Sequence, residues 1–279
     1  MDERIYFKGK TALITGGASG IGASLARLLA EYGCRVIVAD IQEELAAQVV
    51  DEIEVSGGDA QSVILDVRDF QEFNRIVNDT PHLDFLFNNA GVGVGGYISD
   101  HELDDWKTAI DINLYGVIHG VRCGYEVMRR QGSGHIVNTA SMAGLVPSPA
   151  MAAYSASKSA VVSLSKSLRP EAAEIGIKVS VLCPGAVTTP ILDGGGINGR
   201  MPTAIPPEQQ AAIFESLGPI SPEIFAKRAL QQVAMNKEVI IVPSKLKLLW
   251  WLERLWPSML TNIAFKQMQK ILQPLGLQR

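Results

Sequence analysis

Apolar runs and amphipathic stretches alternate along most of the chain. Continuous apolar runs, typical of strands covered on both faces, predict strands near residues 11–15, 35–39, 61–65, 83–87, 134–139, 177–182 and 238–242. Between them, apolar residues recur at helical spacing and predict helices near 20–32, 42–55, 69–78, 103–130, 152–173, 207–216 and 221–235. This alternation is typical of βαβ units, so the sequence predicts an α/β fold with a doubly wound parallel sheet of about seven strands and helices on both faces.

The same pattern suggests one domain followed by an extension. No linker rich in Pro, Gly or Ser divides the chain before residue 190, so residues 1–242 are expected to form a single domain. Within it, a Gly- and Pro-rich segment at about 190–220 is expected to act as a substrate lid. Residues 243–279 are expected to form an amphipathic helical extension.

Composition narrows the class of protein. The chain has 279 residues, of which 47% are hydrophobic and 19% charged, so it can bury a large core. A net charge of −4 gives no basic field for nucleic acid. Three separated cysteines, Cys34, Cys123 and Cys183, are expected to be buried thiols of a cytoplasmic protein. The N-terminus has no apolar signal core, no run of 18 apolar residues occurs, and the four histidines have no metal-ligand spacing.

A glycine-rich turn stands between the first predicted strand and the first predicted helix. It reads T-G-x-x-x-G-x-G from Thr15 and includes Gly16, Ser19, Gly20 and Ile21. Glycines allow a tight turn and a close approach of a phosphate, and the start of a helix offers free N–H groups to an anion. The sequence therefore predicts a dinucleotide site, the alternative being a connecting turn with no ligand.

The cofactor preference depends on Asp40. This residue ends the second predicted strand, about 20 residues after the turn, where a carboxylate can accept hydrogen bonds from the adenosine ribose. The same charge repels a 2′-phosphate, and no Arg or Lys stands beside it. The sequence thus favours NAD over NADP. Asp40 can also cap the following helix, which is compatible with the ribose role.

Two further strand ends carry polar residues. Asp66 and Val67 follow the third predicted strand, where the carboxylate can accept from an adenine amino group or simply close a turn. Asn89 follows the fourth strand in a run of small residues that leaves room for a ribose.

The candidate catalytic residues centre on Tyr154 and Lys158. Four residues apart on a helix, their hydroxyl and ammonium groups can share one site, and the cation is expected to lower the pKa of the phenol. A tuned Tyr can act as a general acid or base. Ser141 follows the strand at 134–139 and can hold a substrate oxygen, while Asn113 can anchor a water that connects to Lys158. A Tyr-x-x-x-Lys pair alone is compatible with an ordinary surface helix.

These motifs, in this order, resemble those of the short-chain dehydrogenase/reductase family, whose fold is Rossmann-like. The resemblance runs from about Lys8 to Val242. Residues that match the family's catalytic tetrad are Asn113, Ser141, Tyr154 and Lys158. Residues that match its cofactor-binding positions are Gly16, Ser19, Gly20, Ile21, Asp40, Asp66, Val67, Asn89, Tyr154, Lys158, Val187 and Thr189.

The resemblance implies hydride transfer between a nicotinamide and a secondary alcohol or ketone. It assigns proton transfer to Tyr154, a supporting role to Lys158, orientation of the substrate oxygen to Ser141 and a relay water to Asn113. It also implies a homodimer or homotetramer. A sensor or scaffold that binds the nucleotide without turnover is the alternative, and the family also includes dehydratases and epimerases.

Substrate choice is expected to depend on the residues Met142–Met151 and on the segment after Thr189. Apart from Arg200, neither offers a cation for a carboxylate or phosphate, which favours an uncharged, apolar substrate over a polar polyol. The substrate's identity, the direction of reaction and its stereochemistry are not encoded in a readable pattern.

The extension after 243 is rich in Trp, Leu and basic residues. It is expected to pack on its own subunit or a neighbour and to roof the substrate pocket. The alternative is a basic amphipathic helix that lies on a membrane surface.

Overall fold

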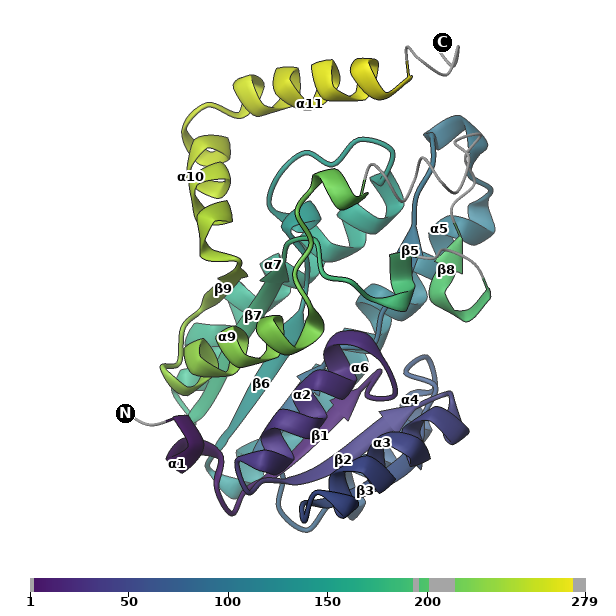
Figure 1. Cartoon of the computed structure of the whole chain (residues 1–279). Coiled ribbons are helices and arrows are strands. Elements are labelled where there is room, and N and C mark those ends of the chain that lie inside the picture. Colours follow the sequence, from purple (N-terminus) through teal and green to yellow (C-terminus); the bar gives the residue numbers. More distant parts are fainter. Residues whose placement is uncertain (1–2, 193–195, 201–213, 273–279) are drawn as a thin grey trace.

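The protein is described by a computed structural model that covers residues 3–192, 196–200 and 214–272. Its centre is a seven-stranded parallel sheet in the order β3-β2-β1-β4-β6-β7-β9, which confirms the predicted architecture (Figure 1). The strands are β1 (Thr11–Thr15), β2 (Arg35–Asp40), β3 (Asp59–Ile64), β4 (Phe85–Asn88), β6 (Gly134–Thr139), β7 (Ile177–Pro184) and β9 (Val239–Val242).

Helices cover both faces of this sheet. They are α2 (Gly20–Glu31), α3 (Glu43–Val55), α4 (Phe70–Asp79), α6 (Gly116–Gln131), α7 (Ala152–Ala173) and α9 (Pro222–Ala234). The short helix α1 (Glu3–Phe7) packs against α9, and α5 (Leu103–Ile110) packs against α7 beyond the main sheet. Neighbouring strand residues point to opposite faces, so Ile14 joins the core beneath α2, α3 and α9, while Leu13 joins the core beneath α4, α6 and α7. Both side chains are fully buried, which explains why the strands consist of continuous apolar runs.

The helix predicted over 103–130 is wrong in one respect. Two helices, α5 and α6, are joined by the π-helical turn η2 (Asp111–Tyr115). Such turns widen the backbone by one residue and are frequent at functional sites. The residue at its centre is Asn113, whose side chain bonds away from the helix to the backbone of Val92.

The segment predicted as a lid lies partly outside the described residues. Residues 193–195 and 201–213 are not described, and most of the helix predicted at 207–216 falls there. The described parts are η4 (Pro190–Leu192), η5 (Gly196–Asn198), β8 (Gly199–Arg200) and residues 214–220. Strand β8 pairs in parallel with β5 (Gly93–Val94) in a small second sheet that the sequence did not predict.

The chain after β9 forms an arm of helices. It comprises η6 (Ser244–Leu246), α10 (Lys247–Leu255) and α11 (Pro257–Leu272). Figure 1 shows α10 rising beyond the end of β9 and α11 turning to run across the top of the molecule. Among the described residues, no helix is both long enough and apolar enough to cross a membrane.

Candidate functional site

The residues selected from the sequence gather at the carboxyl edge of the sheet. From β1 the chain proceeds outward through β2 and β3, then returns to β4 on the other side of β1 and proceeds through β6, β7 and β9. The order therefore reverses between β1 and β4, and open α/β sheets bind ligands at the carboxyl ends of strands beside such a reversal.

The glycine turn joins β1 to α2 with two left-handed residues, Gly16 at φ +63° and Gly20 at φ +51°. Neither has room for a side chain, because a Cβ on Gly16 would lie 2.8 Å from the Cα of Ala90 and one on Gly20 would lie 2.9 Å from Cγ2 of Thr189. Ser19 precedes α2 and makes no capping hydrogen bond with its side chain. The first turn of α2 has no acidic residue, so its N–H groups favour an anion.

Asp40 supports the glycine turn from the neighbouring strand. The residue is 7% exposed, and its Oδ2 accepts the N–H of Ala18 at 3.0 Å while Oδ1 accepts the N–H of Gln42 at 3.0 Å. A carboxylate has about four acceptor positions, so both oxygens can still accept from ribose hydroxyls. Ile21, the next predicted residue of this group, is half-buried and packs against the core beneath α2.

Asp66 and Val67 follow β3. The Asp66 carboxylate forms an ion pair with Arg68, which lowers the pKa of Asp66. This pairing occupies part of the carboxylate that the sequence suggested for adenine. Val67 is buried, and its carbonyl lies 2.9 Å from Nδ1 of His119 on α6.

Asn89 connects three strand ends. Its Nδ2 donates to the carbonyls of Thr15 at 3.1 Å and Gly16 at 3.3 Å, and its Oδ1 accepts from the Thr139 hydroxyl at 3.3 Å. Its side chain thus fixes the start of the glycine turn against the end of β6.

Asn113 is completely buried in the π-helical turn. Its Oδ1 accepts the N–H of Val92 at 2.8 Å, and its Nδ2 donates to the Val92 carbonyl at 3.0 Å and to the Ser157 hydroxyl at 3.3 Å. These bonds use both N–H groups of the amide and one of the two lone pairs of Oδ1, so the side chain is held mainly by the backbone of Val92 and by Ser157.

Tyr154 and Lys158 lie on one face of α7, with Nζ of Lys158 5.7 Å from the centre of the Tyr154 ring. Lys158 is 2% exposed and donates to the Thr139 carbonyl at 3.0 Å. Burial lowers the pKa of Lys158 to about 8. The Ser141 hydroxyl accepts the N–H of Ala143 at 3.1 Å, which places it at the turn after β6.

The expected direction of the Tyr154 pKa is wrong for this structure. Burial raises the pKa of the phenol, and a hydrogen bond with Ser141 lowers it by a smaller amount. Desolvation penalises the charged form of both partners, so it opposes the phenolate at Tyr154 and the ammonium at Lys158 together.

The loop after β7 brings Val187 and Thr189 to the same edge. Val187 is buried and forms a parallel bridge with Ile220. The N–H of Thr188 donates to the Ile220 carbonyl at 3.0 Å, and the N–H of Ile220 donates to the Ala186 carbonyl at 3.1 Å. Thr189 lies against Gly20. The loop after β7 therefore contacts the glycine turn, although the two segments lie far apart in the sequence.

Three contributors to the site are not among the site residues predicted from the sequence. A Cβ on Gly91 would lie 3.0 Å from Oδ1 of Asn113 and 3.2 Å from Nζ of Lys158, so this glycine sits between two catalytic candidates. Thr139 supplies the carbonyl that holds Lys158. Ser157 donates to the Tyr154 carbonyl at 2.7 Å and links it to Asn113. Within residues 3–192, 196–200 and 214–272, no three His, Cys, Asp or Glu side chains form a metal site.

The segment after Ser141 borders a shallow pocket of about 360 Å³. Its lining residues are Ala143, Gly144, Leu145, Val146, Pro147, Ser148, Ala152, Ser155, Ser159 and, from α10, Glu253. Most of these lining side chains are apolar or small. Nη1 of Arg200, the cation that the sequence left open for a substrate, donates to both carboxylate oxygens of Asp105 at 2.9 Å.

The amino-acid sequence is similar to those of known dehydrogenases. The family model for short chain dehydrogenase matches residues 10–195. A 2,5-dichloro-2,5-cyclohexadiene-1,4-diol dehydrogenase, LinX of Sphingobium indicum, is 36% identical over 187 residues, which are 66% of this chain and 75% of the relative.

Solved structures resemble this chain over most of its length. A short chain dehydrogenase/reductase from Burkholderia phymatum in complex with NAD has a TM-score of 0.80 and 31% identity, covering 91% of this chain and 95% of the neighbour. A putative NAD(P) dependent gluconate 5-dehydrogenase from Beutenbergia cavernae, with bound NADP at low occupancy, has a TM-score of 0.73 and 29% identity, covering 84% and 95%.

Proposed function

Because the chain belongs to the short-chain dehydrogenase/reductase family of oxidoreductases, we propose that it transfers a hydride between NAD and an apolar secondary alcohol or ketone. The single observation that carries this proposal is the placement of Lys158 5.7 Å from the Tyr154 ring, at the sheet edge that also carries the glycine turn. Fold alone does not imply chemistry, but these side chains together supply a proton-transfer group beside a nucleotide site.

The residues at the sheet edge fit a nicotinamide nucleotide. The uncapped start of α2 suits a pyrophosphate, and the two glycines keep side chains away from it. Asp40 retains acceptor capacity for ribose hydroxyls and repels a 2′-phosphate, which supports NAD over NADP. The NAD complex of the Burkholderia phymatum neighbour supports the same choice, whereas the Beutenbergia cavernae neighbour binds NADP.

The bound nucleotide supplies or accepts the hydride. The chain's own residues move the accompanying proton: Tyr154 donates it to a ketone oxygen or removes it from an alcohol. Burial raises the pKa of Tyr154, so at neutral pH the phenol holds the proton that reduction of a ketone requires. A charged Lys158 favours the phenolate that oxidation requires, and Ser141 holds the substrate oxygen beside the phenol.

The apolar substrate is supported by two features of the surroundings. The segment after Ser141 presents small and apolar side chains. Arg200, the one cation in these segments of the sequence, is paired through Nη1 with the buried carboxylate of Asp105, which offsets its charge.

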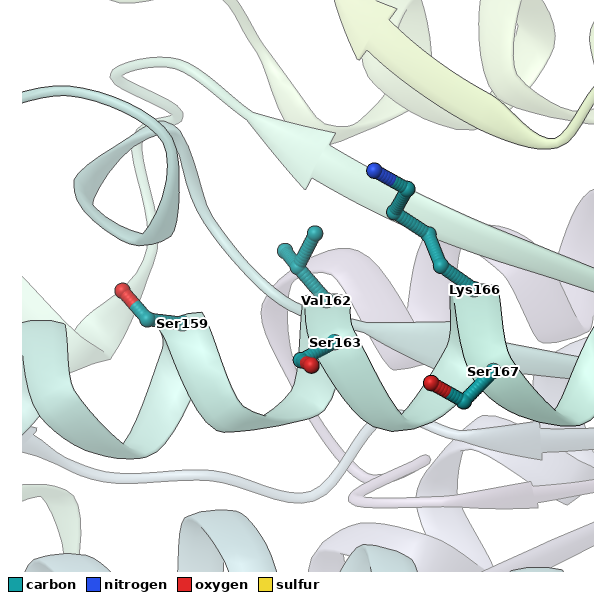
Figure 2. A pocket seen from close by; sticks show the side chains of 5 residues that line it. All are labelled: Ser159, Val162, Ser163, Lys166 and Ser167. Carbon is teal, nitrogen blue, oxygen red and sulfur yellow. The ribbon is translucent and has the colours of Figure 1, made fainter.

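We also propose that the protein is a cytoplasmic homo-oligomer that associates through the outer face of α7. A second shallow pocket, of about 340 Å³, lies on that face and is lined by Ser159, Val162, Ser163, Lys166 and Ser167 (Figure 2). Three serines spaced by four residues allow another helix to approach closely. Ala153, on the same helix, is fully buried within its own chain and does not contribute to this outer face. Measurement of the solution mass at micromolar concentration tests the association, and a monomer would contradict it.

The enzymatic proposal is tested by a substrate screen. Purified protein is mixed with NAD or NADP and a panel of secondary alcohols from short diols to steroids, and the absorbance of the reduced cofactor is followed. We expect turnover with NAD that collapses in Tyr154→Phe, with Tyr125→Phe as a matched control on the outer side of the fold. Tight NADH binding without turnover on any alcohol would instead favour a nucleotide sensor.

A further inference from the structure

The arm formed by α10 and α11 exposes an unusual amount of apolar surface. On α10, Leu248 is 65% exposed, Trp251 55% and Leu255 59%. On the turn to α11 and along α11, Trp256 is 59% exposed, Ile263 43% and Phe265 55%. Exposed large apolar residues gathered on one segment indicate a binding surface, whereas isolated ones do not.

The two faces of α10 differ. Trp250, like Leu246 just before the helix, packs against the main core, and Glu253 faces the pocket beside the segment after Ser141. Leu248, Trp251 and Leu255 recur at spacings of three and four and lie on the opposite, outer face. The inner face therefore holds the arm on the body, and the outer apolar face has no cover within the described part of the chain.

Charge indicates what covers this face. Residues 244–272 contain Lys245, Lys247, Arg254, Lys266 and Lys270 against a single acidic residue, a net charge of +4. All five basic residues are exposed. Since the chain as a whole carries −4, the residues outside the arm carry −8. Arg254 lies over the rings of Trp250 at 5.3 Å and Trp251 at 5.6 Å, so a cation borders the apolar face directly.

We propose that α10 and α11 dock the protein on an anionic lipid bilayer, with the outer apolar face inserted among the headgroups. Anionic headgroups attract the basic arm and repel the acidic body, which orients the molecule with the arm towards the lipid. Three of the four tryptophans lie in the arm, and Trp is enriched where an apolar layer meets water.

The arm lies on the bilayer and does not span it. Helix α11 has 16 residues and is therefore about 24 Å long, shorter than the roughly 30 Å hydrocarbon layer. Its exposed Lys266 and its polar residues would be costly inside the hydrocarbon but are suited to the headgroup region.

A second copy of the chain is a poorer occupant. A symmetric dimer places the same patch on both subunits in contact, which would bring two segments of charge +4 together. Like charges facing each other oppose that contact, whereas an anionic surface neutralises them.

The test is sedimentation of the full chain with vesicles of phosphatidylglycerol and phosphatidylcholine, compared with vesicles of phosphatidylcholine alone. We expect binding to the anionic vesicles only, weakened by salt, with a blue shift of tryptophan fluorescence. Trp251→Ser with Leu255→Ser should abolish binding. Lys247→Gln with Arg254→Gln should weaken it by about 25-fold, at roughly fivefold for each charge.

The matched control replaces two exposed apolar residues outside the arm, Val55→Ser with Leu103→Ser, which are 90% and 86% exposed. This variant should bind vesicles as the unchanged protein does. Absence of binding to anionic vesicles, or equal binding to both vesicle types, would overturn the proposal. A lower solution mass of the Trp251→Ser, Leu255→Ser variant, without vesicle binding by the parent, would assign the face to a second copy. None of these readouts depends on enzymatic activity.

Discussion

Removal of the Asn113 amide should weaken the whole fold, not only the chemistry. In Asn113→Ala, the N–H and the carbonyl of Val92 lose their partners at 2.8 Å and 3.0 Å. Val92 is only 6% exposed, so solvent does not readily replace them. Each buried polar group left unsatisfied costs about 1–3 kcal/mol, so we expect a loss of roughly 2–6 kcal/mol in the free energy of unfolding.

The assay is urea unfolding followed by circular dichroism, with the free energy extrapolated to water and the slope compared between variants. Ser157→Ala is the matched control, because it removes the weaker 3.3 Å contact with the same amide, together with the Ser157 bond to the Tyr154 carbonyl, while the bonds to Val92 remain. We expect the control to lose about 1 kcal/mol. An Asn113→Ala protein within about 0.5 kcal/mol of the parent would refute the reasoning, since surface substitutions produce changes of that size.

Three further changes have definite expected outcomes. Burial lowers the pKa of His135 from 6.5 to about 3, so the free energy of unfolding should fall by about 1.4 kcal/mol per pH unit as the pH decreases between these values. In urea titrations at several pH values, His135→Gln should show a weaker dependence of this free energy on pH. Burial lowers the pKa of Lys158 from 10.5 to about 8, so the folded state disfavours its ammonium group. The inactive variant Lys158→Met should therefore have a free energy of unfolding roughly 1–3 kcal/mol higher at pH 7, and should lose the rise in stability that the parent shows between pH 8 and 10.5. An unchanged dependence of stability on pH would contradict this. In Gly91→Ala, the added methyl group crowds Asn113 and Lys158, so kcat should fall by roughly tenfold while the thermal midpoint, measured as the control, stays nearly constant.

The sequence predicted the main sheet because its signals are local. Neighbours such as Leu13 and Ile14 are both fully buried, on opposite faces, and this produces the continuous apolar runs of a parallel sheet. The glycine turn was visible for a similar reason, since Gly16 and Gly20 occupy left-handed conformations that other residues avoid.

The features that the sequence did not predict depend on contacts between distant segments. The π-helical turn leaves the helical periodicity of 103–130 nearly intact, and the side chain at its centre, Asn113, bonds to Val92, which lies 21 residues earlier. The pairing of β5 with β8 involves two residues from each strand, too few for a periodic signal. The pKa of Tyr154 depends on how deeply the folded chain buries the phenol, which the spacing to Lys158 does not reveal.

The bridge between Val187 and Ile220 gives the protein an internal reporter of nucleotide binding. The amides of Thr188 and Ile220 donate across this bridge, and the adjacent Thr189 touches Gly20 at the glycine turn. Amide hydrogen exchange at the two positions requires the same local opening, so their exchange rates should change together. A ligand that holds Thr189 against the turn would slow both rates. Deuterium uptake at Ile220 would then report binding of a ligand at Gly20, which lies 200 residues earlier in the chain.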